Sequence, residues 1–262
     1  MKENGTIENS KIYPSPNPHI KLLEITYWSC GYRVKGLLAV PRKKGNYEAI
    51  LYLRGGMQSI GMVRPARITQ IASEGFIVFA PYYRGNRGGE GRDEFAGEDR
   101  WDAVYAVEVL KQYCYQDRIH IFSFSRGGIM ALWTAILRRD ITSVIAWAGV
   151  SNIYLTYEER KDMRRMMKRV IGGTPSNKEE AYENRNALVH IQDLKASTLI
   201  IHGMHDTNVS FEHAKFLEEA LITNNKVVET WYYPEFTHYF PSKVNRQIVK
   251  DACSWMKRQR GM

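Results

Sequence analysis

Apolar runs that end at glycine or proline alternate with amphipathic segments along most of this chain. The apolar runs are nearly uniform, and they occupy residues 48–56, 76–81, 117–125, 141–149 and 197–203. Such runs are typical of strands that are covered on both faces. The segments between them repeat apolar residues at helical spacing, over residues 64–75, 98–113, 126–139 and 210–222. Alternating strands and helices predict a parallel sheet with helices on both of its faces.

The two ends of the chain complete this pattern. Residues 22–28 and 32–41 have strand character, and the short loop between them predicts an antiparallel hairpin at one edge of the sheet. Residues 226–234 predict a last strand, and residues 242–259 predict a closing helix. The total is about eight strands, a count that is typical of the α/β-hydrolase architecture.

Two segments interrupt the alternation inside what we expect to be a single α/β-hydrolase domain, residues 1–262. Residues 1–19 are polar and rich in proline, which predicts an extended N-terminal arm. Residues 152–192 are polar, basic and helical in character, with a turn at 172–177. We expect them to form a small, cap-like helical insertion over the sheet edge.

The composition is that of a globular protein with a basic surface. The chain is 44% hydrophobic and 25% charged, and 262 residues are enough to bury one large core. A formal net charge of +9 permits nucleic acid or an anionic surface as a partner. The basic clusters at 164–169 and 257–260 are not interleaved with aromatic residues, as single-strand binders require. We therefore expect no specific nucleic-acid partner.

The sequence shows no sign of membrane insertion or export. No apolar run approaches the roughly 20 residues that span a bilayer, and residues 1–19 lack the apolar core of a secretory signal. Cys30, Cys114 and Cys253 are far apart and odd in number, so they predict neither a disulfide framework nor a metal site. We expect no membrane partner and a cytoplasmic location. Whether the chain forms homo-oligomers stays open.

Three polar residues stand where predicted strands end, which is where such sheets bind their ligands. They are Ser125, Asp206 and His238, in the chain order of the α/β-hydrolase triad. A serine hydroxyl is a weak nucleophile at neutral pH and needs an imidazole to accept its proton. A carboxylate then fixes the imidazole tautomer and stabilises the imidazolium. The order and placement together predict a catalytic triad.

Neighbouring residues are weaker candidates for these roles. His202 lies inside a strand run, which favours a structural role, and His205 precedes the carboxylate. Glu235 is only three residues before His238 and is poorly placed to orient it. The spacing of His202, His205 and His213 matches no zinc motif, and no cysteine lies near them. We expect neither a metal nor a cofactor.

The serine stands in the stretch "IFSFSRGG", residues 121–128, which is close to the Gly-x-Ser-x-Gly turn of these enzymes. That strand-to-helix turn is sharp, and it places the nucleophile in unfavourable backbone angles. Gly127 lets the helix start close to the strand, and we expect Gly128 to serve close packing. Ser123 stands where the pattern has glycine, and serine is the next smallest choice after glycine and alanine. The substitution weakens the motif but leaves the mechanism possible.

An oxyanion hole needs two donors aimed at the developing charge. The backbone N–H of Arg126 follows the nucleophile and starts a helix, which favours negative charge. The second donor should come from the glycine loop in "LRGGMQS", residues 53–59. We expect it to be the N–H of Gly56, with Gly55 as the alternative.

With these residues identified, the chain resembles the catalytic domain of the prolyl oligopeptidase family of serine peptidases. The likeness is greatest to the acylaminoacyl-peptidase and dipeptidyl-peptidase branch. Five segments carry it in order: "LRGGMQS" at 53–59, "APYYRGNRGGEG" at 80–91, "FSFSRGG" at 122–128, "IHGMHDTNV" at 201–209 and "FTHYF" at 236–240.

The resemblance implies Ser125 as nucleophile, Asp206 as orienting carboxylate and His238 as base. Two positions depart from the family, because Ser123 replaces a glycine and Arg54 replaces a histidine before the loop glycines. The large family members also carry a β-propeller that filters substrates, for which 262 residues leave no room. A small peptide or acyl-ester substrate is therefore expected, and the acyl chemistry serves peptidases and esterases equally.

Two arginines flank the predicted pocket, and they allow two interpretations. Arg54 and Arg126 would attract an anionic acyl substrate such as a peptide carboxylate. Alternatively, each pairs with a nearby acid or points to solvent, as arginines commonly do.

The leading interpretation is a serine-type, peptidase-like hydrolase that acts through an acyl-enzyme on a peptide or acyl-peptide bond. A carboxylesterase with the same triad is the competing function. A hypothesis from a different class is a basic binding protein on an inactivated hydrolase scaffold. The intact triad argues against this hypothesis.

Overall fold

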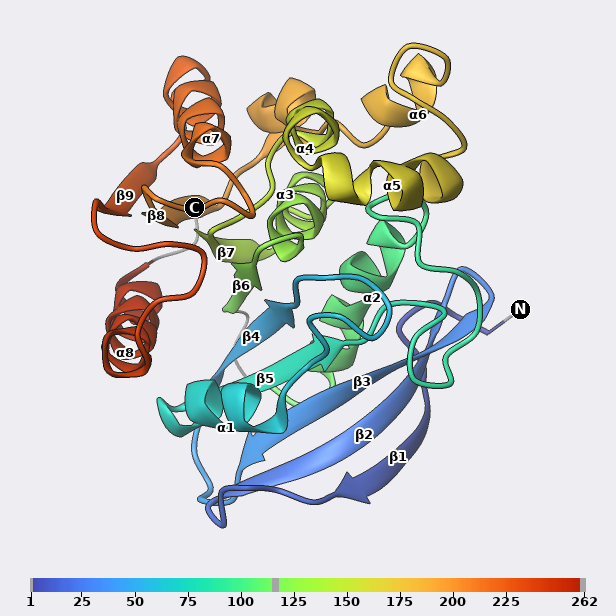
Figure 1. Ribbon diagram of the computed structural model, residues 1–262. Helices are drawn as coiled ribbons and strands as arrows, with labels where there is room; N and C mark the ends of the chain where they lie inside the picture. The colour runs from blue at the N-terminus through green and yellow to red at the C-terminus, as the bar shows by residue number, and fades with distance from the viewer. Residues whose placement is uncertain (1, 115–117, 260–262) are drawn as a thin grey trace.

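The computed structural model describes residues 2–114 and 118–259, and within them a nine-stranded sheet runs through the centre (Figure 1). The strand order is β1-β2-β3-β5-β4-β6-β7-β8-β9. The bounds are β1 Ile7–Tyr13, β2 Ile20–Ser29, β3 Tyr32–Pro41, β4 Glu48–Leu53, β5 Phe76–Pro81, β6 Ile119–Phe124, β7 Ile141–Trp147, β8 Ser197–Gly203 and β9 Val228–Tyr233. The pairs from β1 to β5 are antiparallel, and those from β5 to β9 are parallel.

The strand that the sequence did not predict is β1, which lies inside the segment expected to be an extended arm. The five residues between its two ends are all exposed, so no alternation of apolar and polar positions marks it. It pairs with β2 at the edge of the sheet, where polar side chains discourage pairing with other chains. Three ranges of the sequence analysis extend beyond the described residues. The arm 1–19 includes residue 1, the strand 117–125 includes residue 117, and the basic cluster 257–260 includes residue 260.

The helices cover both faces of the sheet, as the alternation predicts (Figure 1). The bounds are α1 Pro65–Ser73, α2 Arg100–Lys111, α3 Gly127–Leu137, α7 Phe211–Thr223 and α8 Ser242–Arg258. One apolar layer is formed with α1 and α8, and the other with α2, α3 and α7. No helix among the described residues combines the length and apolarity that a bilayer crossing requires.

The segment from 152 to 192, below called the inserted segment, leaves the sheet after β7 and returns at β8. It contains α4 Ile153–Glu159, a 3₁₀ turn at Lys161–Met163, α5 Arg164–Ile171, α6 Glu179–Glu183 and a 3₁₀ helix at Ala187–Asp193. The Asn152 side chain accepts hydrogen bonds from two N–H groups at the start of α4. Gly172 ends α5 with a left-handed φ of 100°. The strands on either side of the segment are internal to the sheet, and the segment runs from the carboxyl end of β7 to the amino end of β8.

Candidate active site

Ser125 lies in the turn that joins β6 to α3. Its φ is +55°, a left-handed conformation that non-glycine residues rarely adopt. Its N–H donates to the Trp147 carbonyl on β7 at 3.0 Å. Its own carbonyl accepts from the N–H groups of Gly128 at 2.9 Å and Val150 at 3.0 Å. The strained turn that the sequence predicts is therefore present, and backbone hydrogen bonds from two loops maintain it.

The residues around Ser125 are small because backbone atoms approach them closely. A Cβ atom on Gly127 would lie 2.1 Å from the Leu53 carbonyl oxygen at the end of β4. A Cβ atom on Gly128 would lie 2.7 Å from the Cα atom of Gly149. Ser123 is completely buried. The tight contact at the turn therefore explains the two glycines directly.

Ser123 adds a hydrogen bond that glycine would lack. Its hydroxyl donates to the Ile145 carbonyl on the neighbouring strand at 2.7 Å. The side chain thus fits in the small space beside the turn and satisfies its own polar group there. This contact accounts for a serine at a position where the sequence pattern has glycine.

Asp206 and His238 meet at the carboxyl ends of β8 and β9. Asp206 lies in the loop between β8 and α7, and His238 lies in the loop between β9 and α8. His238 Nδ1 is 2.7 Å from Asp206 Oδ2, and both side chains are buried. With Nδ1 donating to the carboxylate, Nε2 of the imidazole is the free acceptor.

Asp206 is held as a carboxylate. Its Oδ1 accepts from the N–H groups of Asn208 at 2.8 Å and Val209 at 3.0 Å. Burial alone would raise the pKa of Asp206, but hydrogen bonds from His202 and His238 lower that pKa well below its usual range. His202 Nε2 lies 2.9 Å from the Val209 carbonyl and 3.4 Å from Asp206 Oδ2. His202 therefore supports the carboxylate loop, as its place in a strand predicts.

The rival candidates lie away from this contact. His205 and Glu235 are both exposed, so neither faces the buried imidazole of His238. His213 is buried against another partner, with its Nε2 3.1 Å from Glu159 Oε1. Asp206 is thus the carboxylate that the structure places against His238.

A glycine loop at residues 54–61 comes close to Ser125 from the end of β4. A Cβ atom on Gly55 would lie 2.7 Å from the Ser125 Cβ atom. Gly56 has a φ of +65°, and a Cβ atom there would lie 2.3 Å from the Ile60 carbonyl oxygen. Among the described residues, neither the N–H of Gly56 nor that of Arg126 has a hydrogen-bond acceptor. Both donors are therefore free to bind a ligand beside Ser125.

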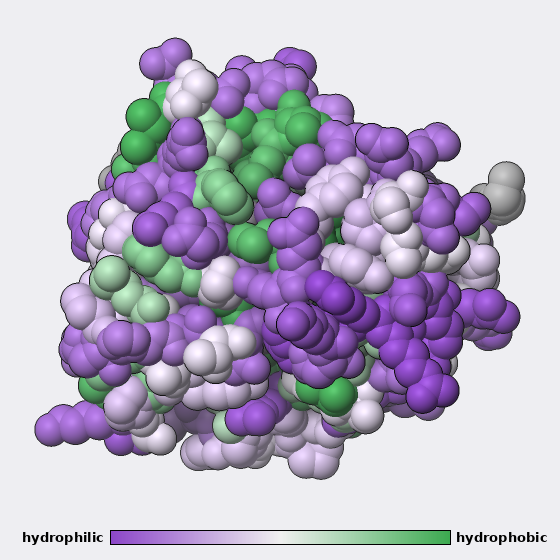
Figure 2. Space-filling model, turned by 45° about the horizontal axis from the view of Figure 1, so that its top comes forward, coloured by the Kyte–Doolittle hydropathy of each residue, from purple (hydrophilic) through white to green (hydrophobic). Residues whose placement is uncertain are grey.

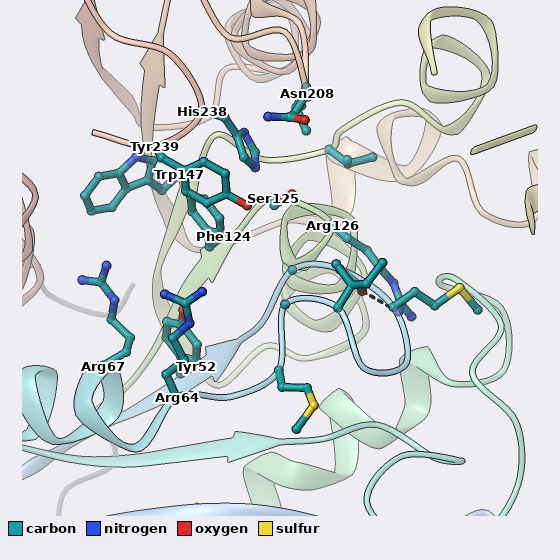
Figure 3. Close-up of a pocket in the computed structure, with 18 of the residues that line it drawn as sticks. Tyr52, Arg64, Arg67, Phe124, Ser125, Arg126, Trp147, Asn208, His238 and Tyr239 are labelled. Carbon is teal, nitrogen blue, oxygen red and sulfur yellow. Dashed lines mark hydrogen bonds between the residues drawn. The ribbon is translucent and has the colours of Figure 1, made fainter. Parts of the chain in front are cut away.

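These loops enclose a pocket of about 790 Å³ that contains Ser125 and His238 (Figure 3). Its aromatic lining residues are Tyr52, Phe95, Phe122, Phe124, Trp147, Tyr239 and Phe240. The inserted segment contributes a further wall through Met163 and Met166. In Figure 3 the His238 ring lies above Ser125, and both side chains face the pocket. The geometry offers a hydroxyl, an imidazole acceptor and free N–H donors in one partly apolar space.

Comparison with known proteins identifies the family. Residues 62–262 match the Peptidase_S9 family, which is described as the prolyl oligopeptidase family. The chain belongs to the prolyl oligopeptidase family. The match includes the segments that contain Ser125, Asp206 and His238, whereas the glycine loop at 54–61 precedes it. As a member of this family the protein is a hydrolase, as the sequence resemblance predicts.

Relatives and solved structures agree with this family. The "Uncharacterized peptidase YtmA" of Bacillus subtilis (strain 168) is 55% identical over 254 residues, which cover 96% of this chain and 99% of the relative. A Pyrococcus horikoshii acylaminoacyl peptidase structure has a TM-score of 0.79 at 19% identity, covering 94% of this chain and 42% of that chain. An acetyl xylan esterase from Paenibacillus sp. R4 has a TM-score of 0.76 at 15% identity, covering 97% and 90%. These structures confirm the predicted α/β-hydrolase fold.

Arg54 does not reach the pocket, which corrects the expectation that it contacts a substrate. Its side chain is 2% exposed and is not among the residues that line the pocket. Its guanidinium donates to the carbonyls of Tyr82, Gly55 and Ile60 at 3.0 to 3.3 Å. The arginine that replaces the family's histidine therefore fastens the glycine loop from inside.

The side chain of Arg126 serves the same loop. Its guanidinium donates to the Gly56 carbonyl at 3.1 Å and to the carboxylates of Asp93 and Asp99. The guanidinium of Arg126 also lies 5.1 Å from the Tyr83 ring centre. Because its charge is neutralised by two buried carboxylates, this arginine offers no free charge to a substrate. The alternative interpretation, pairing with nearby acids, is the correct one.

Asp93 and Asp99, the two acids that pair with Arg126, were not identified from the sequence. Burial raises the pKa of Asp99 to about 7, although the nearby Arg126 charge opposes that rise. Burial would also raise the pKa of Asp93, but Arg126 lowers it below its ordinary value. Both acids follow β5 in an irregular loop, about thirty residues from their partner. No spacing rule links such distant residues, so their pairing was not predictable.

Proposed function

We propose that this protein is a serine hydrolase that cleaves a peptide or acyl-peptide bond through an acyl-enzyme. The observation that carries the proposal is the 2.7 Å contact between His238 and Asp206, in the pocket that also contains the strained Ser125. Ser125 is the nucleophile, His238 the general base and Asp206 the carboxylate that orients the imidazole.

The reaction proceeds in two balanced steps. The Ser125 hydroxyl oxygen bonds to the substrate carbonyl carbon while His238 Nε2 accepts the hydroxyl proton. The imidazolium then gives that proton to the leaving amine or alcohol as its bond to the carbonyl carbon breaks. A water molecule next attacks the acyl-enzyme, with His238 accepting its proton and returning one to the serine oxygen. These steps use only side chains of this chain and the water, so they require no cofactor.

The N–H groups of Gly56 and Arg126 would stabilise the oxyanion in both steps. They lie on the loop and on the helix start that flank Ser125, and neither has an acceptor among the described residues. The start of α3 adds a positive helix dipole at the same place. One such donor contributes a factor of about 10² to 10³ to the turnover rate.

A carboxylesterase is the second candidate, and the acetyl xylan esterase comparison favours it. That esterase is matched over 90% of its chain, whereas the acylaminoacyl peptidase is matched over 42%. The match thus includes nearly the whole of the esterase and less than half of the peptidase. The ratio of kcat/KM for a p-nitrophenyl acyl ester and an aminoacyl p-nitroanilide separates the two functions. Measurable cleavage of the anilide supports the peptidase, and cleavage of the ester alone supports the esterase.

Covalent labelling tests the serine mechanism itself. A fluorophosphonate probe should label wild-type protein at neutral pH, and labelling should disappear in Ser125→Ala. The matched control Ser123→Gly removes a hydroxyl from the same turn and should still be labelled. Absence of labelling in the folded wild-type protein would instead support a non-catalytic binding protein on this scaffold.

A further inference from the structure

Three arginines line one side of the pocket, beside the aromatic residues. Arg64 and Arg67 lie at the start of α1, and Arg246 lies near the start of α8. In Figure 3 the side chains of Arg64 and Arg67 extend toward Trp147 and Tyr239, while the side chain of Arg126 points the other way. Figure 2 shows that hydrophilic residues dominate the molecular face that it presents. Arg64, Arg67 and Arg246, below called the arginine wall, line the same pocket as Ser125.

The charges of this wall are not neutralised. None of Arg64, Arg67 and Arg246 has a carboxylate within ion-pair distance among residues 2–114 and 118–259. Of the described residues that line the pocket, Asp162 is the one carboxylate, and it pairs with Arg160 at 2.7 Å. The wall therefore brings three positive charges to the pocket of the nucleophile, in contrast to the paired Arg126 and Arg160.

Arg67 is held in place by neutral groups. Its Nη1 donates to the Gln70 Oε1 atom at 3.2 Å, and its Nη2 donates to the Asn245 Oδ1 atom at 2.7 Å. The bond to Gln70 stays within α1, the bond to Asn245 ties α1 to α8, and together they orient the guanidinium without cancelling its charge. A fixed, partly buried guanidinium with remaining N–H donors matches the geometry of a carboxylate.

The floor beside Arg67 reduces solvent access to that half-buried guanidinium, whereas Arg64 and Arg246 are exposed. Tyr52 and Trp147 are 8% and 2% exposed, and both line the pocket. A less aqueous surrounding strengthens the attraction between a guanidinium and a substrate carboxylate. Free ions in solution compete less well there than at an open surface.

The position of His238 indicates which part of the substrate meets the arginines. His238 protonates the leaving group, so the leaving group lies on the His238 side of Ser125. Tyr239, Asn245 and Arg246 follow His238 in the chain and line the same pocket, and Asn245 accepts a hydrogen bond from Arg67. The inserted segment, whose helix α5 lies well away from α8 in Figure 1, lines the pocket with Met163 and Met166, which suit an apolar acyl part.

We infer that Arg64, Arg67 and Arg246 form a subsite for the free C-terminal carboxylate of a short peptide, on the leaving-group side of Ser125. The inference rests on the proposed function, because it names the substrate class of the same site. The protein would then release one or two residues from the carboxyl end of small acylated peptides. The charge of the arginine wall, and not that of Arg54 or Arg126, would recognise the anion.

Two peptides that differ only at the C-terminus test this subsite. They are an N-acyl tripeptide with a free carboxylate and the same peptide with a C-terminal amide. We expect wild-type protein to prefer the carboxylate form in kcat/KM. Arg67→Gln should lower the ratio of the two kcat/KM values by about tenfold or more, the range of a charge-assisted hydrogen bond. Arg67→Lys should lower it less, because the charge remains.

Arg169→Gln is the matched control for net charge. Arg169 lies on the exposed face of α5 and does not line the pocket, so its loss should leave the ratio at the wild-type value. The double variant Arg64→Gln with Arg246→Gln removes two charges without breaking the hydrogen bond from Arg67 on α1 to Asn245 on α8. A lowered ratio in both pocket variants supports the subsite. A ratio that stays at the wild-type value in both, or no wild-type preference for the carboxylate, overturns it.

Binding to Ser125→Ala separates this inference from the proposed function. Calorimetry with the same two peptides measures carboxylate preference without turnover. Tighter binding of the carboxylate peptide, lost in Ser125→Ala with Arg67→Gln, supports the subsite even if wild-type protein fails to react with fluorophosphonate. Equal binding of the two peptides refutes the subsite even if labelling of Ser125 succeeds.

Discussion

Replacing Gly127 by alanine tests the physical account of the nucleophile turn. The new Cβ atom would lie 2.1 Å from the Leu53 carbonyl oxygen and 2.8 Å from the Leu53 carbonyl carbon. These are backbone atoms of β4, which is hydrogen-bonded on both sides to β5 and β6. The strand therefore cannot give way, and the start of α3 must move instead.

The magnitude follows from the contact distance. A carbon and a carbonyl oxygen pack at about 3.3 Å or more, so the helix start must shift by about 1 Å. Alanine gains about 0.5 to 1 kcal/mol over glycine in a helix, but overpacking costs about 1 to 3 kcal/mol, so the variant is destabilised. The shift also displaces Ser125 relative to the glycine loop. A misplacement of about 1 Å lowers turnover by about 10².

The assay measures kcat/KM with a p-nitrophenyl ester alongside the melting temperature. Gly31→Ala is the matched control, because Gly31 has a φ of +81° and no atom within 4 Å of a new Cβ. Its left-handed strain costs about 1 to 2 kcal/mol at a turn between β2 and β3. The control should lose stability and keep its activity. If Gly127→Ala retains kcat/KM within threefold of wild type, the tight-turn reasoning is wrong.

The remaining predictions concern the surroundings of the nucleophile. Ser123→Gly should keep most of the kcat/KM for a p-nitrophenyl ester, whereas Ser123→Val should lower it by distorting the turn; equal activities would refute the size argument. Arg126→Gln should lower the free energy of unfolding in urea by about 3 to 5 kcal/mol, because Asp99 loses its buried ion-pair partner while Asp93 keeps Arg54 at 3.8 Å, and a loss below about 1 kcal/mol would contradict this. Asp206→Asn should reduce kcat by a factor of about 10³ to 10⁴ through loss of the correct tautomer. Because the folded-state pKa of Asp206 is lowered, its ionised form stabilises the fold above about pH 4, and this contribution is lost as the pH falls below that value. The difference in melting temperature between wild type and Asp206→Asn should therefore shrink below about pH 4. A difference that stays constant with pH would exclude this linkage.

The order of elements could be read from the sequence because burial on both faces leaves uniform apolar runs. The parallel strands from β4 to β8 and the helices between them were predicted within a few residues. The edge strand β1 was not, because only its end residues Ile7 and Tyr13 pack against the core and the five exposed residues between them leave no hydrophobic pattern. Hydrophobic periodicity indicates burial, and it cannot predict a strand whose interior residues are exposed.

The same distinction separates the candidate site residues. Ser125, Asp206 and His238 each follow a recognisable strand, and parallel strands bring their carboxyl ends to one edge of the sheet. Their convergence thus follows from topology that the sequence already contains. The partners of the Arg54 and Arg126 side chains do not follow from that topology, because a side chain's partner depends on which loops meet in space. The hypothesis that these two side chains attract a substrate anion was therefore wrong.

The sequence by itself determined the layered α/β arrangement, the order of the three triad candidates and the small residues around the serine. These follow from local rules, namely periodicity and the absence of room at a sharp turn. Only the tertiary structure decided which arginines are neutralised and which are free. Arg54 and Arg126 are buried against carbonyls and carboxylates from distant loops, while Arg64, Arg67 and Arg246 line one pocket from two helices. The sequence gives the number of charged residues, but whether a charge is neutralised depends on which residues lie beside it in the folded protein.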